Sequence, residues 1–162
     1  MLKSGSKAPE FVLENDQGGE SSLTDLLQDG PLILYFYPAD FTPGCTKEAC
    51  SIRDVHDDLV SVGLQVVGIS PQDGESHARF REAHDLPFLL LSDVDKVAIR
   101  MYDVDGPFGV GVRRVTYLIS QGKKIQDALQ ADVLVGRHRE FIDKAIMLRE
   151  AAGMRSTADK DD

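Results

Sequence analysis

The chain contains only two cysteines among its 162 residues, and its 18 basic residues are outnumbered by 27 acidic ones. Two cysteines are too few for a fold held together by several disulfides. A chain of this length can also fold without a disulfide, so a structural disulfide is the weaker interpretation of the pair. The formal net charge of −9 argues against binding to nucleic acid or to anionic membranes, because both require a basic patch. Small solutes and other proteins remain as the expected partners.

Long apolar runs are also absent from the sequence. No run approaches the roughly 20 apolar residues of a membrane span, and residues 1–5 lack the apolar core of a signal peptide. We therefore expect a cytoplasmic protein that does not enter a membrane. Hydrophobic residues make up 42% of the chain and no repeat or linker divides it, which predicts one globular domain over residues 1–154 and a disordered polar tail over residues 155–162.

Strand-like and helix-like segments alternate along the chain. Apolar runs at residues 32–36 and 64–70 predict two strands buried on both faces, and the helix between them makes a βαβ unit with parallel strands. Residues 112–120 and the segment from Lys124 predict an antiparallel hairpin, and residues 136–152 predict an amphipathic helix. The pattern predicts an α/β fold with a central mixed sheet flanked by helices.

Both cysteines fall in one stretch, YFYPADFTPGCTKEAC, over residues 35–50. The strand-forming residues end at Pro38, and Thr42 and Pro43 open a predicted helix, so Cys45 lies in its first turn. A thiol there meets unpaired backbone N–H groups and the positive end of the helix dipole, which favour the reactive thiolate. Cys45 is therefore the candidate nucleophile.

The motif Pro38-x3-Thr42-x2-Cys45 resembles the active site of the peroxiredoxins, and its flanks resemble the subgroup called bacterioferritin comigratory protein or peroxiredoxin Q. The resemblance covers the chain to about residue 150 and implies a thioredoxin-like fold with an N-terminal hairpin extension. Four further segments share it: residues 5–11 (GSKAPEF), 67–70 (VGIS), 91–93 (LSD) and 114–119 (RVTYLI).

The resemblance implies a role for each residue of the motif. Cys45 is the implied peroxidatic cysteine, which attacks the terminal peroxide oxygen and becomes a sulfenic acid. Cys50 is the implied resolving cysteine, which then forms a disulfide with it. Thr42 matches the hydroxyl that binds peroxide and thiolate, and Pro38 matches the residue that shields the pocket.

Arg114 matches the guanidinium that holds the thiolate and the developing negative charge. Breaking an O–O bond builds charge on both oxygens, so fixed donors should bind more strongly in the transition state than before it. The neighbouring Arg113 should point to the opposite face of the strand, and only Arg114 has the family spacing. Glu48 matches an acidic position beside the active site, to which we assign an orienting role.

The spacing of the two cysteines restricts how they can react. In an intact α-helix, residues five apart have Cα atoms about 8.7 Å apart, whereas a disulfide needs about 4.4–6.8 Å. Joining Cys45 to Cys50 therefore requires the helix to unwind locally. Pro43 and Gly44 lower the cost, because glycine is a poor helix residue and the first turn has few hydrogen bonds to lose.

The implied activity is a thioredoxin-dependent peroxidase that reduces hydrogen peroxide and alkyl hydroperoxides. Glutaredoxin is the alternative reductant, and no cofactor is expected because the two sulfurs carry both electrons. We expect a monomer. Two other hypotheses use the same cysteine pair: a non-enzymatic redox sensor, and a disulfide oxidoreductase acting on protein thiols, which the absence of a Cys-x2-Cys motif disfavours.

The four histidines do not cluster with the cysteines along the sequence. A zinc site needs about four converging ligands, so no metal is expected. Each histidine is interpreted as a surface residue of a helix: His56, His77, His84 and His138.

Overall fold

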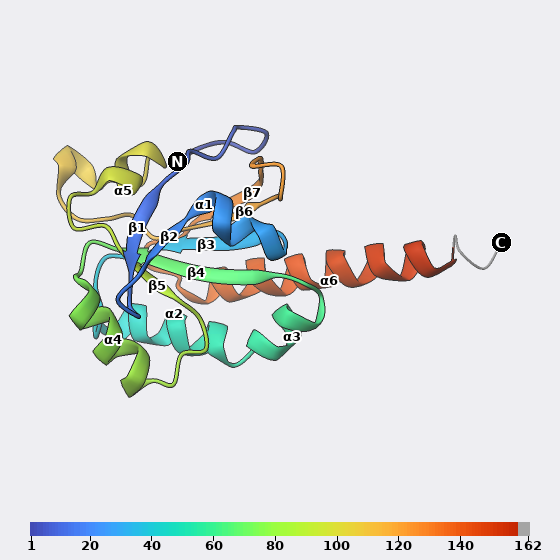
Figure 1. Cartoon of the computed structure of the whole chain (residues 1–162), viewed down its shortest axis with the longest axis horizontal. Helices are drawn as coiled ribbons and strands as arrows, with labels where there is room; N and C mark the ends of the chain where they lie inside the picture. The colour runs from blue at the N-terminus through green and yellow to red at the C-terminus, as the bar shows by residue number, and fades with distance from the viewer. Residues whose placement is uncertain (159–162) are drawn as a thin grey trace.

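A seven-stranded mixed sheet lies at the centre of the structure, a computed structural model that describes residues 1–158 (Figure 1). The strand order is β2-β1-β5-β4-β3-β6-β7. The strands are β1 (Val12–Asn15), β2 (Glu20–Ser22), β3 (Leu32–Phe36), β4 (Gln65–Ser70), β5 (Leu90–Ser92), β6 (Val115–Ile119) and β7 (Ile125–Gln130).

Strand β3 occupies the interior of the sheet, as its apolar run predicts. All five of its residues are buried. It pairs parallel with β4 and antiparallel with β6, so that Tyr35 lies between Gly68 and Thr116. The β3–α2–β4 connection is the predicted βαβ unit, and β6 with β7 is the predicted antiparallel hairpin. The thioredoxin-like α/β fold and its N-terminal hairpin, β1–β2, are confirmed.

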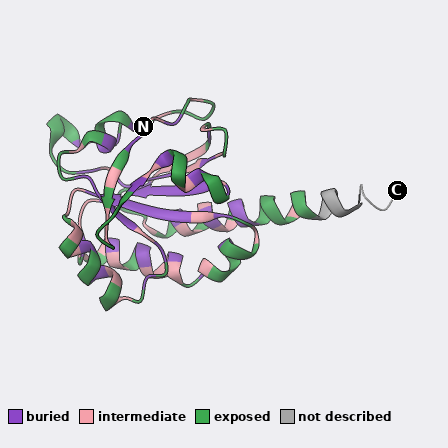
Figure 2. Ribbon diagram, viewed as in Figure 1, coloured by how far each residue is buried: buried purple, intermediate pink, exposed green. Residues whose placement is uncertain are grey.

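The helices cover both faces of the sheet (Figure 1). Figure 2 shows that the strands between them are largely buried, and residues 147–153 of α6 are mostly exposed. One face carries α1 and α5, and the other carries α2, α3, α4 and α6. Their bounds are α1 (Leu23–Leu26), α2 (Pro43–Arg53), α3 (His56–Ser61), α4 (Gly74–Ala83), α5 (Val97–Met101) and α6 (Gly136–Ala158), with 3-10 turns at Leu27–Asp29 and Pro107–Gly109.

Helix α4 begins at a side-chain cap that fixes its position over the sheet. The carboxylate of Asp73 accepts a hydrogen bond from the backbone N–H of Ser76 at 2.8 Å, which satisfies one of the free donors of the first turn. Phe80 then reaches the core between the helix and the sheet, where it is fully buried. The first turn of α4 contacts the loop that precedes Cys45, because Ser76 and His77 both bond to the Asp40 carboxylate.

Helix α6 is longer than the sequence pattern predicts. It continues through Ala158, so residues 155–158, predicted as part of a disordered tail, are helical. Arg155 and Ala158 are good helix formers and the stretch contains no glycine or proline, which favours continuation once the helix is nucleated. The remainder of the predicted tail, residues 159–162, lies outside the described residues. Among residues 1–158, no helix is long and apolar enough to cross a membrane.

Candidate active site

Cys45 lies in the first turn of α2, which begins six residues after β3 leaves the sheet. Pro43 occupies the first helical position, where its missing N–H costs nothing. The first intrahelical bond of this turn runs from Thr46 N–H to the Thr42 carbonyl at 2.9 Å. The thiol is almost fully buried, with 1% of the residue exposed. It therefore sits beside N–H groups that have no intrahelical partner, in a position that excludes most water.

The Arg114 guanidinium reaches the thiol from the neighbouring part of the sheet. Arg114 directly precedes β6, and its Nη2 donates to the Cys45 Sγ at 3.3 Å. Its backbone N–H donates to the Asp132 carboxylate at 2.7 Å, which fixes the start of the strand. Arg113 points away, because its Nε donates to the Asp105 carbonyl at 3.2 Å. Arg114 alone of the two arginines faces Cys45.

Glu48 shares the other end of the Arg114 guanidinium. It lies three residues after Cys45, on the same face of α2, and its Oε2 accepts from Arg114 Nη1 at 3.1 Å. Burial raises the pKa of the Glu48 carboxyl to about 7, because the loss of hydration outweighs the attraction of Arg114. Burial by itself lowers the pKa of Arg114, but the nearby Glu48 and Cys45 raise it overall, so the guanidinium stays charged.

This buried pair leaves some hydrogen-bonding capacity unused. Oε1 of Glu48 and Nε of Arg114 have no protein partner among the described residues. The free carboxyl oxygen can take up a proton near neutral pH, and the guanidinium has a further donor to offer. The site is therefore rich in donors and holds a carboxyl group whose charge is easily lost.

Thr42 and Pro38 lie on the loop between β3 and α2 that leads into the turn holding Cys45. Thr42 occupies the N-cap position of α2, yet its side chain makes no bond to the helix N–H groups. Its Oγ1 instead donates to the Ala39 carbonyl at 3.1 Å, which leaves the hydroxyl oxygen free to accept a hydrogen bond. Pro38 is half-buried. The helix-capping role that threonine usually fills at this position is absent here.

Cys50 lies on the same unbroken helix as Cys45. Both thiols are free, and Cys50 is half-buried where Cys45 is buried. Ideal helix geometry puts their Cα atoms about 8.7 Å apart and rotates them by about 140° around the axis. A disulfide cannot form between them in this conformation.

A cavity of about 600 Å³ opens beside the first turn of α2, and Cys45 is not among the residues that line it. Gly44 belongs to its wall, and a Cβ at this position would lie 3.1 Å from Arg114 Nη2. The small residue therefore leaves room for the guanidinium. The lining residues are Pro43, Gly44, Lys47, Val133, Leu134, Val135, Gly136, Arg137 and Glu140.

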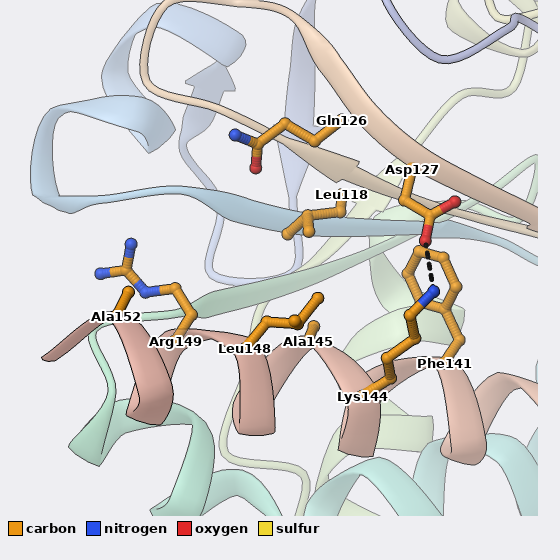
Figure 3. A pocket seen from close by; sticks show the side chains of 9 residues that line it. All are labelled: Leu118, Gln126, Asp127, Phe141, Lys144, Ala145, Leu148, Arg149 and Ala152. Carbon is orange, nitrogen blue, oxygen red and sulfur yellow. Dashed lines mark ion pairs between the residues drawn. The ribbon is translucent and has the colours of Figure 1, made fainter. Parts of the chain in front are cut away.

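A second hollow, of about 340 Å³, lies away from the cysteines between α6 and the β6–β7 hairpin (Figure 3). Leu118, Phe141 and Leu148 supply apolar surface, and Lys144 points toward the Asp127 carboxylate at 3.7 Å. None of the residues predicted for the reaction lines it. It has no part in the chemistry at Cys45.

Two of the four histidines contradict the prediction that all lie on the surface. His77 and His138 are fully buried. Burial lowers the pKa of His138, which fits a neutral ring that accepts from the Thr116 hydroxyl at Nδ1 (2.7 Å) and donates from Nε2 to the Ala131 carbonyl (2.9 Å). His77 bonds to Asp40, a loop residue that sequence reasoning also missed.

The sequence contained a signal that each of these two histidines is buried. His77 and Phe80 are three residues apart in a predicted helix, so they share a face, and Phe80 marks that face as the buried one. His138, the third residue of α6, shares a face in the same way with Ile142 and Ala145, which are buried.

Comparison with known proteins identifies the family. Residues 4–128 match the AhpC/TSA family. The chain belongs to this family. Peroxiredoxin Bcp of Bacillus subtilis is 39% identical over 133 residues, which span 78% of this chain and 84% of that protein. The match places the chain among the peroxiredoxins of the Bcp and peroxiredoxin Q subgroup and confirms the resemblance found in the sequence.

Solved structures agree with this assignment. The peroxidoxin BcpB from Mycobacterium tuberculosis superposes on this chain with a TM-score of 0.84 at 34% identity. The superposition covers 93% of this chain and 98% of the Mycobacterium protein. A bacterioferritin comigratory protein of Xanthomonas campestris, studied for its alkyl peroxide reduction activity, gives a TM-score of 0.77 at 27% identity and covers 88% and 91% of the two chains. The peroxiredoxin is therefore a peroxidase.

Proposed function

We propose that this peroxiredoxin reduces hydrogen peroxide and alkyl hydroperoxides, with Cys45 as the peroxidatic and Cys50 as the resolving cysteine. The observation that supports it most directly is the 3.3 Å contact from Arg114 Nη2 to the buried Cys45 sulfur. A cation with a rigid set of donors beside a buried thiol favours thiolate over thiol. The Xanthomonas protein supports alkyl peroxides as substrates.

In the first step, the Cys45 thiolate attacks the terminal oxygen of the hydroperoxide. A sulfur–oxygen bond forms, the O–O bond breaks, and its electron pair leaves on the inner oxygen, which takes a proton and departs as alcohol or water. Cys45 is left as a sulfenic acid. Arg114 and the backbone N–H groups of the first turn stabilise the charge that develops on the oxygens, and Thr42 orients the peroxide.

The resolving step joins the two sulfurs. The Cys50 thiol attacks the Cys45 sulfenic acid, a disulfide forms, and its hydrogen leaves with the hydroxyl as water. Because helix α2 holds the two residues about 8.7 Å apart, its first turns must unwind before this step. The prediction is tested by amide hydrogen exchange across residues 42–53, which should be faster in the disulfide than in the dithiol form. Equal exchange in both forms would contradict it.

A dithiol protein then returns the enzyme to its starting state by thiol–disulfide exchange at an exposed sulfur. We propose thioredoxin as this reductant. Coupled turnover with thioredoxin and its reductase tests the proposal, and turnover only with glutaredoxin would overturn the choice of partner. Oxidation of one equivalent without any turnover would instead make the protein a redox sensor.

Mass spectrometry after one equivalent of peroxide tests the roles of the two cysteines. The parent protein should lose two hydrogens as a Cys45–Cys50 disulfide, whereas Cys50→Ser should stop at the Cys45 sulfenic acid or its overoxidised forms. Cys45→Ser should not react. A stable sulfenic acid in the parent protein would refute the resolving role of Cys50.

A further inference from the structure

A closed hydrogen-bond network joins the loop before Cys45 to α4 and β5, and none of its residues has a role in the proposed reaction. At its centre is Asp40, in the loop between β3 and α2. Its Oδ1 accepts from the Tyr37 hydroxyl at 2.7 Å, and its Oδ2 accepts from the Ser76 hydroxyl at 2.8 Å and lies 2.6 Å from His77 Nδ1. We call Tyr37, Asp40, Ser76 and His77 the Asp40 clamp. The side chains of Asp40 and His77 are wholly buried.

The partners in the clamp define its protonation. Nε2 of His77 lies 3.1 Å from the Leu91 carbonyl, which can only accept, so Nε2 holds a proton. A second proton must then lie between Nδ1 and the Asp40 carboxyl, since neither atom could otherwise donate across 2.6 Å. The pair is electrically neutral as a whole and has a partner at every polar atom, which is how a buried ionisable pair is tolerated.

The clamp ties one loop to three fixed elements. Tyr37 directly follows β3, Ser76 and His77 belong to the first turn of α4, and the Leu91 carbonyl belongs to β5. Asp40 thus anchors the chain two residues before Thr42. On the other side of Cys45, Glu48 anchors α2 to Arg114.

Residues 41–47 lie between the two anchors and contain the first turn of α2. Phe41 has a positive φ of 61°, is 52% exposed and packs edge-on against Phe80 of α4. The Thr42 side chain makes one hydrogen bond, to the Ala39 carbonyl. The resolving step requires this first turn to open.

We propose that Asp40 and His77 are positioning residues of the peroxidase, which fix the N-terminal limit of the segment that unwinds during turnover. The inference rests on the proposed function. With the clamp intact, opening begins at Phe41 and Thr42 returns to the same place when the helix reforms. Without the clamp, the whole loop loosens together with the first turn of α2. The folded conformation that reacts with peroxide is then less populated, and the unwound conformation is more populated.

The first test compares reaction rates by quenched-flow mass spectrometry. In Asp40→Asn, an amide that cannot take the shared proton, Cys45 oxidation by peroxide should slow on the order of tenfold or more, since small displacements of reacting groups have large effects. The peroxide concentration at which half of the Cys45 is overoxidised should rise, because disulfide formation becomes faster relative to overoxidation. Ser76→Ala removes only one donor to Asp40, so it should also slow Cys45 oxidation and raise the overoxidation threshold, but by less than Asp40→Asn.

A matched pair of tyrosines separates positioning from stability. Tyr37→Phe removes a 2.7 Å hydroxyl bond to Asp40, and Tyr102→Phe removes a 2.8 Å hydroxyl bond to the Pro9 carbonyl on the other face of the sheet. Both should lower the melting temperature by a few degrees. Only Tyr37→Phe should change the overoxidation threshold. An equal threshold in both variants and the parent would reduce the clamp to a stabilising role and overturn the proposal.

Hydrogen exchange tests the clamp without any catalysis. The Cys45–Cys50 disulfide is formed with a chemical thiol oxidant, and exchange is followed at the amides of Tyr37, Ala39 and Asp40 and at those of residues 44–47. In the parent, the first group should stay protected while residues 44–47 exchange fast, whereas Asp40→Asn should lose protection in both groups. Uniform fast exchange in the parent would refute the clamp. Failure of the parent to turn over peroxide would count against the proposed function alone.

Discussion

Replacing Glu48 with glutamine should abolish a pH dependence of stability that this single carboxyl creates. Its pKa is raised from the ordinary 4.5 to about 7 by burial. Each pKa unit corresponds to about 1.4 kcal/mol, so ionised Glu48 destabilises the folded protein by about 3 kcal/mol relative to its neutral form. The stability supplied by the neutral carboxyl is fully present below pH 4.5 and is lost as the pH rises through about 7.

The measurement is denaturant unfolding at pH 5 and pH 8, with Cys45→Ser in both proteins to exclude thiol ionisation and oxidation. The free energy of unfolding of the Glu48 protein minus that of the Glu48→Gln protein should fall by about 2–3 kcal/mol between the two pH values. Glu140→Gln, a change at an exposed carboxylate of α6, serves as the control and should show no such trend. A difference independent of pH would refute the reasoning, because Arg114 would then outweigh burial and keep Glu48 ionised throughout.

Two further predictions concern the first turn of α2. Arg114→Lys keeps the positive charge but loses the planar guanidinium that contacts both Cys45 and Glu48. The rate constant for the reaction with peroxide should therefore fall on the order of a hundredfold in stopped-flow assays, while Arg113→Lys should leave it unchanged. Equal rates in the two variants would contradict the assignment of Arg114 to the site. Gly44→Ala favours the helical form of the first turn by up to about 1 kcal/mol, but its Cβ would lie 3.1 Å from Arg114 Nη2, so the guanidinium must shift. Both peroxide reduction and disulfide formation should therefore slow several-fold in quenched-flow experiments, and an unchanged rate of disulfide formation would show that this turn does not open.

The framework of the fold was predictable because it depends on local patterns. A short uninterrupted apolar run rich in aromatic and β-branched residues favours a strand buried on both faces, and β3 is buried along its whole length. The position of Cys45 followed from the proline and threonine that open α2. The prediction that Arg114 lies beside Cys45 came from the family resemblance, because the two residues are 69 positions apart and no local sequence pattern connects them.

The clamp was beyond sequence reasoning for a physical reason. An aspartate in a turn is ordinarily solvated and bonds its own backbone, so Asp40 carries no sign of burial. Its partner His77 is 37 residues away on a helix, and the contact arises only when α4 packs on the sheet. The length of α6 was missed because its end depends on continued helix propensity, with no glycine cap or proline to mark it.

The placement of Arg114 has a consequence for the chain while it is being made. Both cysteines precede it in the sequence, and the strand that it begins, β6, pairs with β3 from the far side. Proteins are synthesised from the N-terminus, so a growing chain presents its thiols well before the guanidinium that activates them has been added. The reactive centre is thus completed only after Arg114 has been added and β6 has paired with β3.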